Sequence, residues 1–233
     1  MANPFFFEEH LPAVNSFSLN EETSRHVVQV LRMRAGERIN LTNGKGQLIS
    51  AEITTPDKKG TIVKLLSADE FLRPVSKVTI ALSLLKNENR FEWFVEKATE
   101  TGVTSILPLI CERTEKQHFR YERMKKIMIS AMLQSQQGWM PVLEEPATCE
   151  GVIKRNGFVQ KFIAHCAGEQ KTSLKNVEKT QGDKIILIGP EGDFTAGEIA
   201  LSMEHNFIPV SLGNTRLRTE TAGVYAAVIL QAE

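Results

Sequence analysis

The sequence predicts an α/β protein in which a small N-terminal β-barrel precedes an α/β domain built on a parallel sheet. Residues 1 to about 72 contain mainly short apolar strands between turns, whereas strands and helices alternate from Lys77 onward. The pattern changes near Leu72-Arg73-Pro74, so we expect one domain over residues 1–72 and a second over residues 73–233. A chain of 233 residues is long enough to bury two modest cores.

Three strands and one helix define the N-terminal domain. Glycine-containing turns separate the strands, which are expected over Ile39–Thr42, Leu48–Thr54 and Thr61–Leu66. An amphipathic helix is expected over Glu21–Met33, with Asn20 as its N-cap. The buried face of this helix is predicted to carry Val27, Val30 and Leu31. A closed or nearly closed β-barrel with one helix is the most economical arrangement of these elements.

Strands and helices alternate in the C-terminal domain. Apolar runs predict five strands, over Val78–Leu85, Thr104–Ile110, Val159–His165, Lys184–Ile188 and Ile208–Leu212. Helical periodicity predicts helices over Arg90–Thr101 and Phe119–Gln137 and two more that begin at Thr195 and Thr219. The first of these helices ends at Gly102, and its predicted buried residues are Phe91, Phe94, Val95 and Ala98. This order of elements predicts a parallel sheet covered by helices.

Two loops, each between an apolar strand and a helix start, form the best candidate for a ligand site. The first contains Gly189-Pro190-Glu191-Gly192, and its helix opens at Thr195 with Glu198 at the spacing of a capping box. The second runs from Leu212-Gly213 to Leu217-Arg218-Thr219. If the two strands are parallel, both loops leave the carboxyl edge of the sheet, where open α/β sheets bind ligands. The helix starts favour an anionic ligand group such as a carboxylate.

Arg218 is the strongest candidate for a functional side chain in these loops. A cation just before a helix N-terminus opposes the helix dipole, so helix stability does not explain it. An anionic partner, or negative charge that develops during a reaction, would explain it. Glu220 is a weaker candidate, because a carboxylate in the first turn stabilises a helix in any case.

Composition argues against several functional classes. The 28 basic and 28 acidic residues balance, so net charge predicts neither nucleic-acid nor membrane binding. The three cysteines are widely spaced and the five histidines are scattered, so neither a disulfide framework nor a metal site is expected. The sequence contains no Walker A or Gly-x-Gly-x-x-Gly run. The longest apolar stretch, Val224–Leu230, is too short to cross a bilayer, and the first residues lack a basic leader, so we expect a soluble, cytoplasmic protein.

Basic residues are concentrated in two segments. One lies in the N-terminal domain and contains Arg25, His26, Arg32, Arg34 and Arg38. The other lies in the C-terminal domain and contains Arg113, Lys116, His118, Arg120, Arg123, Lys125 and Lys126. Such clusters are more often solvated faces than nucleic-acid contacts, and charge alone does not decide between these interpretations.

Taken together, the two loops resemble those of the knotted SPOUT-class methyltransferases, in particular the family that methylates N3 of a uridine in small-subunit (16S) ribosomal RNA. The matching loop motifs are Gly189-Pro190-Glu191-Gly192 and Leu217-Arg218-Thr219-Glu220-Thr221-Ala222. Further matches extend over nearly the whole chain: Arg25-His26, Val30-Leu31-Arg32, Gly36-Glu37, Lys86, Arg90, Glu92, Lys97, Glu100, Gly102-Val103, Gln134-Ser135 and Pro141.

This resemblance implies a PUA-like RNA-binding barrel over residues 1–72 and a SPOUT methyltransferase domain with a deep trefoil knot over residues 73–233. It implies a homodimer whose active site uses both subunits, with catalytic roles for Arg218 and Glu220. S-adenosylmethionine is the implied cofactor, and the residues implied to bind it are Gly189, Pro190, Glu191, Gly192, Leu212, Gly213, Leu217 and Thr219. The residues implied to bind RNA are Arg25, Arg32 and Arg34.

The implied substrate is a uridine in an assembled or partly assembled small ribosomal subunit. Two alternatives stay open: a related SPOUT enzyme that methylates a ribose 2′-OH or a guanine nitrogen, and a non-catalytic RNA-binding protein of the same fold. The chain has Asp193 where this family usually has glycine, and Gln137 and Trp139 near a position where arginine is common. These departures from the family pattern keep the non-catalytic alternative open.

Overall fold

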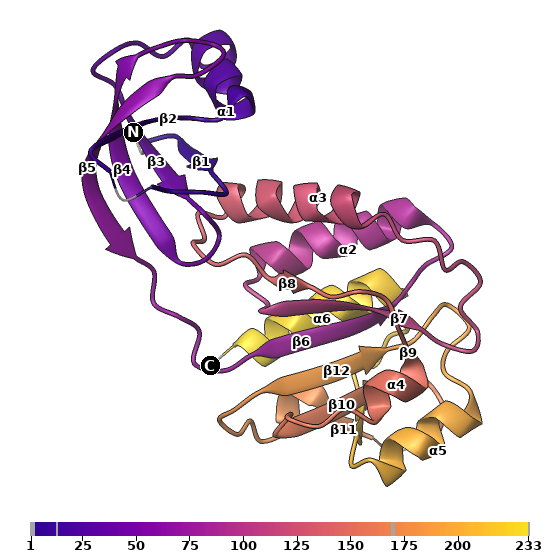
Figure 1. Ribbon diagram of the computed structural model, residues 1–233. Helices are drawn as coiled ribbons and strands as arrows, with labels where there is room; N and C mark the ends of the chain where they lie inside the picture. Colours follow the sequence, from indigo (N-terminus) through magenta and orange to yellow (C-terminus); the bar gives the residue numbers. More distant parts are fainter. Residues whose placement is uncertain (1–2, 13, 169–170, 233) are drawn as a thin grey trace. The chain divides into compact units, whose positions relative to one another are not determined.

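The computed structural model describes residues 3–12, 14–168 and 171–232, and it contains two compact units (Figure 1). The first unit comprises residues 1–73 together with residues 132–140. The second comprises residues 74–131 and 141–233. A single boundary after residue 72 therefore does not account for the segment 132–140, which packs with the N-terminal unit.

A five-stranded sheet forms the N-terminal unit. Its strands are β1 (Phe5–Phe7), β2 (Ser16–Ser18), β3 (Arg38–Thr42), β4 (Gln47–Thr55) and β5 (Ile62–Glu70). They follow the order β1-β3-β4-β5-β2; β1 and β3 are parallel, and the other pairs are antiparallel. The three predicted strands are confirmed. Strands β1 and β2 were not predicted, because three residues are too few to show a two-residue alternation.

The helix of this unit is shorter than predicted and changes type. Helix α1 (Glu21–Arg25) begins at the predicted N-cap, where Asn20 Oδ1 accepts a hydrogen bond of 2.8 Å from Thr23 N. A π-helical segment, His26–Val30, then ends it. The prediction of one helix to Met33 with three buried apolar residues is therefore wrong. Val27 is buried, but Val30 and Leu31 are 64% and 42% exposed, because π-helical spacing shifts the residues after Val27 away from the face expected for an α-helix.

The segment 132–140 completes the N-terminal unit. Trp139 Nε1 donates a hydrogen bond of 3.2 Å to the carbonyl oxygen of Phe71. Gly138 lies so close to the Phe71 ring that a Cβ there would overlap it, and Gly46 is packed equally tightly under the Trp139 ring. The Trp139 side chain is thus a packing residue of this unit.

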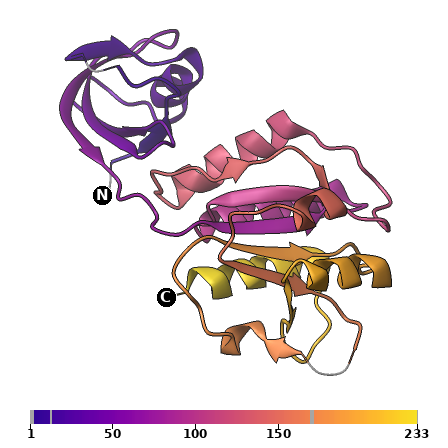
Figure 2. The same cartoon turned by 60° about the horizontal axis from the view of Figure 1, so that its bottom comes forward.

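An eight-stranded parallel sheet forms the C-terminal unit (Figures 1 and 2). Its strands are β6 (Val78–Ser83), β7 (Ser105–Ile110), β8 (Val142–Leu143), β9 (Ala147–Thr148), β10 (Gln160–Ala164), β11 (Thr172–Ser173), β12 (Lys184–Ile188) and β13 (Ile208–Ser211). They follow the order β11-β13-β10-β12-β6-β7-β8, and β9 also pairs with β7. The five predicted strands are confirmed, and the three missed strands have two residues each.

Helices cover both faces of this sheet. They are α2 (Glu88–Glu100), α3 (Tyr121–Gln134), α4 (Cys149–Ile153), α5 (Ala196–Glu204) and α6 (Thr219–Gln231). Leu82 of β6 lies against Gly223 of α6, whereas its neighbour Ala81 packs in the cluster that includes residues of α4 and α5. Neighbouring residues of a strand point to opposite faces, so α5 and α6 lie on opposite sides of the sheet. In the part of the chain that the structure describes, no helix is long and apolar enough to cross a membrane.

Candidate functional site

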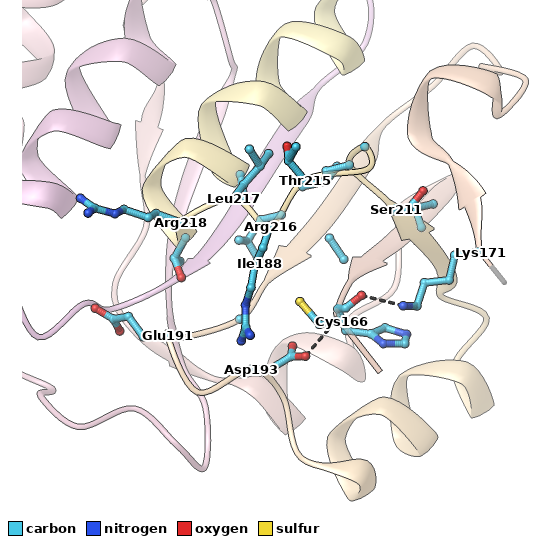
Figure 3. A pocket seen from close by; sticks show the side chains of 18 of the residues that line it. Cys166, Lys171, Ile188, Glu191, Asp193, Ser211, Thr215, Arg216, Leu217 and Arg218 are labelled. Atoms are coloured by element: carbon cyan, nitrogen blue, oxygen red, sulfur yellow. Dashed lines mark hydrogen bonds between the residues drawn. The ribbon is translucent and has the colours of Figure 1, made fainter. Parts of the chain in front are cut away.

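A pocket of about 850 Å³ opens at the carboxyl edge of the parallel sheet (Figure 3). Three strands end in its wall: β10 at Ala164, β12 at Ile188 and β13 at Ser211. Strand β10 lies between the other two in the sheet, so the loops that follow β12 and β13 stand on either side of the end of β10. This is the place where the sequence predicted a ligand site.

Most of the predicted cofactor residues line this pocket. Seven of the eight do so: Gly189, Pro190, Glu191, Leu212, Gly213, Leu217 and Thr219. Gly192 lies outside the lining, and its carbonyl oxygen accepts a hydrogen bond of 2.7 Å from Arg113 Nη1. A Cβ at position 192 would lie 3.5 Å from Arg113 Cδ, an ordinary contact. A side chain there would meet Arg113, so the structure gives no reason to expect that it would block the pocket.

The loop from β12 to α5 is held by its own side chains. The predicted capping box is confirmed: Thr195 Oγ1 accepts from Glu198 N at 3.3 Å, and Glu198 Oε2 accepts from Thr195 N at 2.9 Å. Glu198 Oε1 also accepts a hydrogen bond of 2.9 Å from Glu112 N, just beyond β7. The start of α5 is therefore satisfied within the protein and fixed to a neighbouring strand.

Asp193 adopts a backbone conformation that glycine favours, with φ of 62°. Its carboxylate compensates locally, because Oδ1 accepts from Phe194 N at 2.9 Å and Oδ2 accepts from Cys166 N at 2.8 Å. The second bond joins the loop after β12 to the loop after β10. Asp193 thus adds a tether between two walls of the pocket.

The loop from β13 to α6, unlike the loop from β12 to α5, leads to a helix start without a side-chain cap. It passes through Gly213, whose φ of 128° is a conformation that side chains disfavour, and it ends at Arg218 in the N-cap position of α6. Arg218 is exposed, makes no capping hydrogen bond, and has no ion-pair partner among the described residues. The pocket therefore contains an unpaired guanidinium beside an uncapped helix start.

Glu220 lies behind the pocket wall instead of in it. The residue is 7% exposed and is not among the lining residues. Its Oε1 atom lies 3.7 Å from Nε of Arg90, which comes from α2 and does line the pocket, and its Oε2 atom has no hydrogen-bond partner among the described residues. In this arrangement Glu220 can act on a ligand only through Arg90.

A third wall of the pocket, which was not predicted, comes from the segment after β10. Its lining residues are His165, Cys166, Gly168 and Lys171. In Figure 3, Cys166 and Lys171 lie on the opposite side of the pocket from Glu191 and Arg218. A signal was present, because Val159–His165 was predicted as a strand and its carboxyl end belongs to the same edge of a parallel sheet.

The predicted RNA-binding residues lie in the N-terminal unit. Arg25, Arg32 and Arg34 are exposed there, within and just after the helix. Arg25 forms an ion pair of 2.6 Å with Glu21, and Arg32 has a left-handed backbone with φ of 54°. Exposed Val30 and Leu31 lie between these arginines in the sequence. Apolar and basic side chains are therefore exposed together in this segment.

The second basic segment is largely neutralised by carboxylates of α2. Lys116 pairs with Glu88 at 2.5 Å, and Arg120 pairs with the same carboxylate at 2.6 Å. Arg123 donates to both oxygens of Glu92, and this hydrogen bonding holds the pKa of the Glu92 carboxyl below its usual value. This segment is an ion-pair network on the surface of the unit, which weakens it as a candidate for RNA contact.

Comparison with known families identifies the chain. The family described as an RNA methyltransferase domain matches residues 72–231, and the RNA methyltransferase PUA domain matches residues 19–66. The chain belongs to the RNA methyltransferase family. The predicted family and fold class are thereby confirmed: an N-terminal PUA-like domain is followed by an α/β methyltransferase domain with a parallel sheet.

Relatives of this methyltransferase match it over nearly its whole length. The ribosomal RNA small subunit methyltransferase E of Rickettsia conorii is 28% identical over 96% of this chain and 93% of the relative. The crystal structure of a probable rRNA-methyltransferase from Porphyromonas gingivalis is 34% identical, covers 96% of this chain and 95% of that chain, and has a TM-score of 0.89. The crystal structure of a ribosomal RNA small subunit methyltransferase E from Neisseria gonorrhoeae, bound to S-adenosyl methionine, is 28% identical. It covers 99% of this chain and 97% of that chain, also with a TM-score of 0.89.

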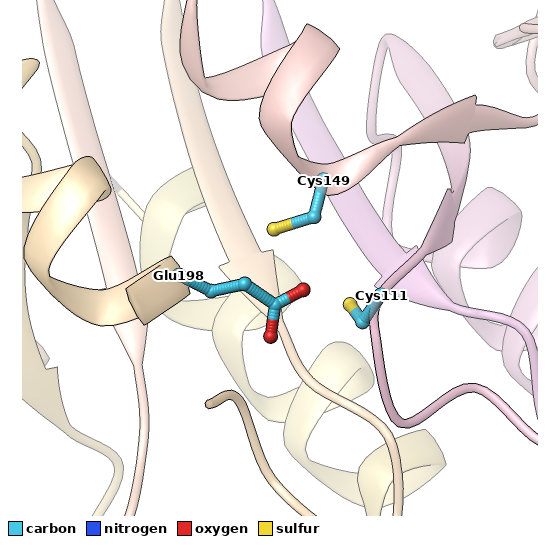
Figure 4. Close-up of side chains that lie close together, drawn as sticks. All are labelled: Cys111, Cys149 and Glu198. Carbon is cyan, nitrogen blue, oxygen red and sulfur yellow. The ribbon is translucent and has the colours of Figure 1, made fainter. Parts of the chain in front are cut away.

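A cluster of potential metal ligands lies in the core of the methyltransferase domain (Figure 4). The Sγ atoms of Cys111 and Cys149 and a carboxylate oxygen of Glu198 lie within 4.8 Å of one another. The cluster offers three ligands, one fewer than a closed structural zinc site needs. Both oxygens of Glu198 already accept hydrogen bonds from Thr195 and Glu112. The geometry is therefore accounted for by helix capping and thiol packing.

Proposed function

We propose that this protein transfers a methyl group from S-adenosylmethionine to N3 of a uridine in small-subunit (16S) ribosomal RNA. The observation that carries the proposal is the pocket at the sheet edge, in which the cofactor loops meet the unpaired guanidinium of Arg218. Relatives named small subunit methyltransferase E and a related structure with bound S-adenosyl methionine support both the substrate and the cofactor.

The pocket residues fit this cofactor. The uncapped start of α6 favours the carboxylate of the methionine part, and pocket carboxylates such as Glu191 are suited to its ammonium group. The ring nitrogens of His165, which are buried and have no hydrogen-bond partner among the described residues, offer further hydrogen bonds. We assign cofactor contacts to the seven predicted residues that line the pocket and withdraw Gly192 from that role. When bound, the cofactor supplies an electrophilic methyl group on a positively charged sulfur.

The protein side of the reaction concerns the proton on uridine N3. This atom lies on the Watson–Crick edge, so the base must be unpaired or flipped before it can react. Loss of its proton leaves negative charge shared with O2 and O4, which Arg218 is placed to stabilise, either directly or by holding a nearby phosphate. Glu191, which is exposed in the pocket, or a water molecule is better placed to accept the proton than buried Glu220. Glu220 then serves by positioning Arg90.

RNA contact is proposed for the segment that contains Arg25, Arg32 and Arg34. On a protein of zero net charge these residues give only modest non-specific attraction, so we expect a structured target, the assembled or partly assembled small subunit. Ribosomal subunits are found in the cytoplasm, so we propose a cytoplasmic location for this protein. Replacing all three arginines with glutamine should weaken subunit binding and its salt dependence while leaving cofactor affinity unchanged.

We also propose that the protein is a homodimer and that it requires no metal ion. The trefoil knot stays a prediction. In the apolar stretch Val224–Leu230 of α6, Ala226, Ala227, Ile229 and Leu230 are buried within the unit, whereas Val228 is exposed and favours self-association. Light scattering of the full chain at micromolar concentration should report two chains, and a monomer would argue against an active site shared between subunits. Treatment with a chelator should leave turnover unchanged, and metal analysis should find no stoichiometric ion.

Product analysis tests the reaction directly. Small subunits from a strain that lacks the gene are incubated with the enzyme and labelled S-adenosylmethionine and digested to nucleosides. The nucleosides are separated by liquid chromatography and identified by fragmentation in the mass spectrometer, because 3-methyluridine and 2′-O-methyluridine have the same mass. The expected product is 3-methyluridine at one position, formed faster as pH rises because loss of the N3 proton precedes or accompanies methylation. Label in a 2′-O-methyl nucleoside or a methylguanosine would support a related SPOUT activity instead. Cofactor binding without any label would support the non-catalytic alternative.

A further inference from the structure

Two cysteines that are far apart in the sequence meet in the core of the methyltransferase domain (Figure 4). Cys111 directly follows β7, and Cys149 begins α4. Their Sγ atoms lie within 4.8 Å of each other, and the two residues are 3% and 2% exposed. The third cysteine, Cys166, is exposed. The two buried thiols therefore form a pair that large molecules do not reach.

The strand register brings this pair together. Strands β7 and β9 are parallel, and Ile110 lies opposite Thr148. Cys111 and Cys149 are the next residues along each chain segment, so the same register places them opposite each other. Residues in this relation have Cα atoms about 5 Å apart, within the range of roughly 4.4–6.8 Å that a disulfide spans. A bond between the two sulfurs therefore needs rotation of side chains and little movement of the backbone.

Cys111 begins a turn that supports the loop from β12 to α5. The next residue, Glu112, donates a backbone hydrogen bond of 2.9 Å to Glu198 at the start of α5. Arg113 then donates a hydrogen bond of 2.7 Å to the carbonyl oxygen of Gly192 in the same loop. A covalent bond that holds Cys111 would therefore also restrain this turn.

The surroundings of the pair keep it reduced under mild conditions. The Cys111 thiol raises the pKa of the Cys149 thiol above its ordinary value, and burial and the negative charge of Glu198 raise it further. Cys149 therefore stays protonated near neutral pH, and a protonated thiol is a poor nucleophile. Oxidation of the pair thus needs a small, reactive oxidant that enters the core during a local opening. Hydrogen peroxide is such an oxidant.

We propose that Cys111 and Cys149 form a dithiol site that hydrogen peroxide oxidises to a disulfide, which locks the turn after β7 to the start of α4. One sulfur first attacks peroxide: an S–O bond forms, the O–O bond breaks, and the thiol proton leaves in one molecule of water. The second sulfur then displaces the hydroxyl group, which leaves with the second thiol proton as water. The two sulfurs lose two electrons in total, and peroxide is reduced to two waters. The Glu198 carboxylate, within 4.8 Å of both sulfurs, is placed to take up a thiol proton during these steps.

Peptide mapping and thermal melting of the full chain test the site. After treatment with hydrogen peroxide and alkylation of the remaining thiols, tryptic peptides should contain a linkage between Cys111 and Cys149, and dithiothreitol should remove it. The thermal midpoint of the oxidised protein should rise by about 5 °C or more, because the cross-link constrains the unfolded chain. Amide hydrogen exchange in the turn after β7 should become slower.

The variant Cys149→Ala is the matched control. It has lost one partner of the pair, so the same peroxide treatment should raise neither its thermal midpoint nor the protection of the turn. This control separates the disulfide from oxidation of the methionines and of exposed Cys166. If the variant does not fold, reversal of the wild-type midpoint by dithiothreitol replaces it, because dithiothreitol reduces a disulfide but not a sulfinic acid.

Three results would overturn the proposal. Separate sulfinic acids at Cys111 and Cys149 would show that the sulfurs do not reach each other. Two intact thiols, after treatment in buffer and again in urea that promotes local opening, would show that the pair is inert. A linkage that lowers the thermal midpoint would show that the bond strains the fold instead of locking it.

Discussion

The two helices that start at the pocket edge, α5 and α6, begin in opposite ways. Helix α5 is capped by Thr195 and Glu198, which satisfy each other's backbone amides. Helix α6 has Arg218 at its N-cap, and that side chain makes no capping bond. Both helices follow parallel strands of the same sheet. The difference between their N-termini therefore comes more from their sequences than from their positions in the fold. The start of α5 thus contributes to stability, whereas the start of α6 is left available to a ligand.

The way each helix is held in place supports this distinction. The start of α5 is fixed by Glu198, which also bonds to Glu112 N beyond β7. Helix α6 is held by its middle instead, where Gly223 approaches β6 so closely that a Cβ would lie 2.3 Å from Leu82 Cδ1 and 2.7 Å from Phe94 Cε2. Close packing at Gly223 lets the first turn of α6 remain without a cap.

The largest effect is expected from Arg218→Ala, which removes the feature that distinguishes α6. Turnover should fall by at least about a hundredfold, because the guanidinium that we propose to stabilise the developing negative charge is lost. Affinity for S-adenosylmethionine should stay within about threefold. Single-turnover kinetics and calorimetry measure the two quantities. Arg216→Ala, a second exposed pocket arginine, is the control and should have a smaller effect on turnover. Collapse of cofactor binding in Arg218→Ala would show that the helix start serves the cofactor instead of the reaction.

Gly223→Ala tests whether α6 is held by its middle. The added methyl group has no room between Leu82 and Phe94, so the free energy of unfolding should fall by about 2 kcal/mol or more. Urea denaturation measures the change. Gly197→Ala in α5 is the matched control, because its Cβ would lie 3.9 Å from the nearest atom, Thr195 Oγ1, and it should be neutral or slightly stabilising. Equal losses in the free energy of unfolding for Gly223→Ala and Gly197→Ala would show that α6 is not held by its middle.

Exchanging the N-cap residues tests whether capping alone distinguishes α5 from α6. Thr195→Ala should lower the free energy of unfolding by about 1 kcal/mol, because it removes the cap of α5. Arg218→Ser should raise the free energy of unfolding by about 0.5–1 kcal/mol, since serine supplies the cap that α6 lacks, and should lose turnover as Arg218→Ala does. Chemical denaturation of both variants is the measurement. A destabilised Arg218→Ser would mean that the arginine has a structural role.

The smallest effect is expected at Gly192, in the loop that leads to the capped helix. A Cβ there meets Arg113 at ordinary contact distance, so Gly192→Ala should change cofactor affinity by about twofold or less. Gly213→Ala, in the loop that leads to α6, should weaken binding more, because φ of 128° strains a side-chain residue at the pocket wall. Calorimetry compares the two. Loss of binding in Gly192→Ala would place that residue back among the cofactor contacts.

Local patterns in the sequence determined much of this fold. Apolar runs predicted the longer strands of both units, and Asn20, Thr195 and Gly102 marked helix ends that the structure has. These signals act within a few residues, where hydrogen bonding and backbone geometry are decided locally. The rule that parallel strands place their following loops at one edge was sufficient to locate the pocket and Arg218.

Contacts between distant residues decided the rest. The short strands, the π-helical turn after Arg25 and the packing of residues 132–140 with the N-terminal unit depend on tertiary pairing, which leaves no periodic signal. The third wall of the pocket exists because β10 lies between β12 and β13 in the sheet, an order that the sequence does not state. Burial likewise placed Glu220 behind the wall, and the hydrogen bond from Arg113 holds exposed Gly192 outside the pocket lining. Sequence therefore determined which loops line the pocket, while the strand order determined which further side chains face into it.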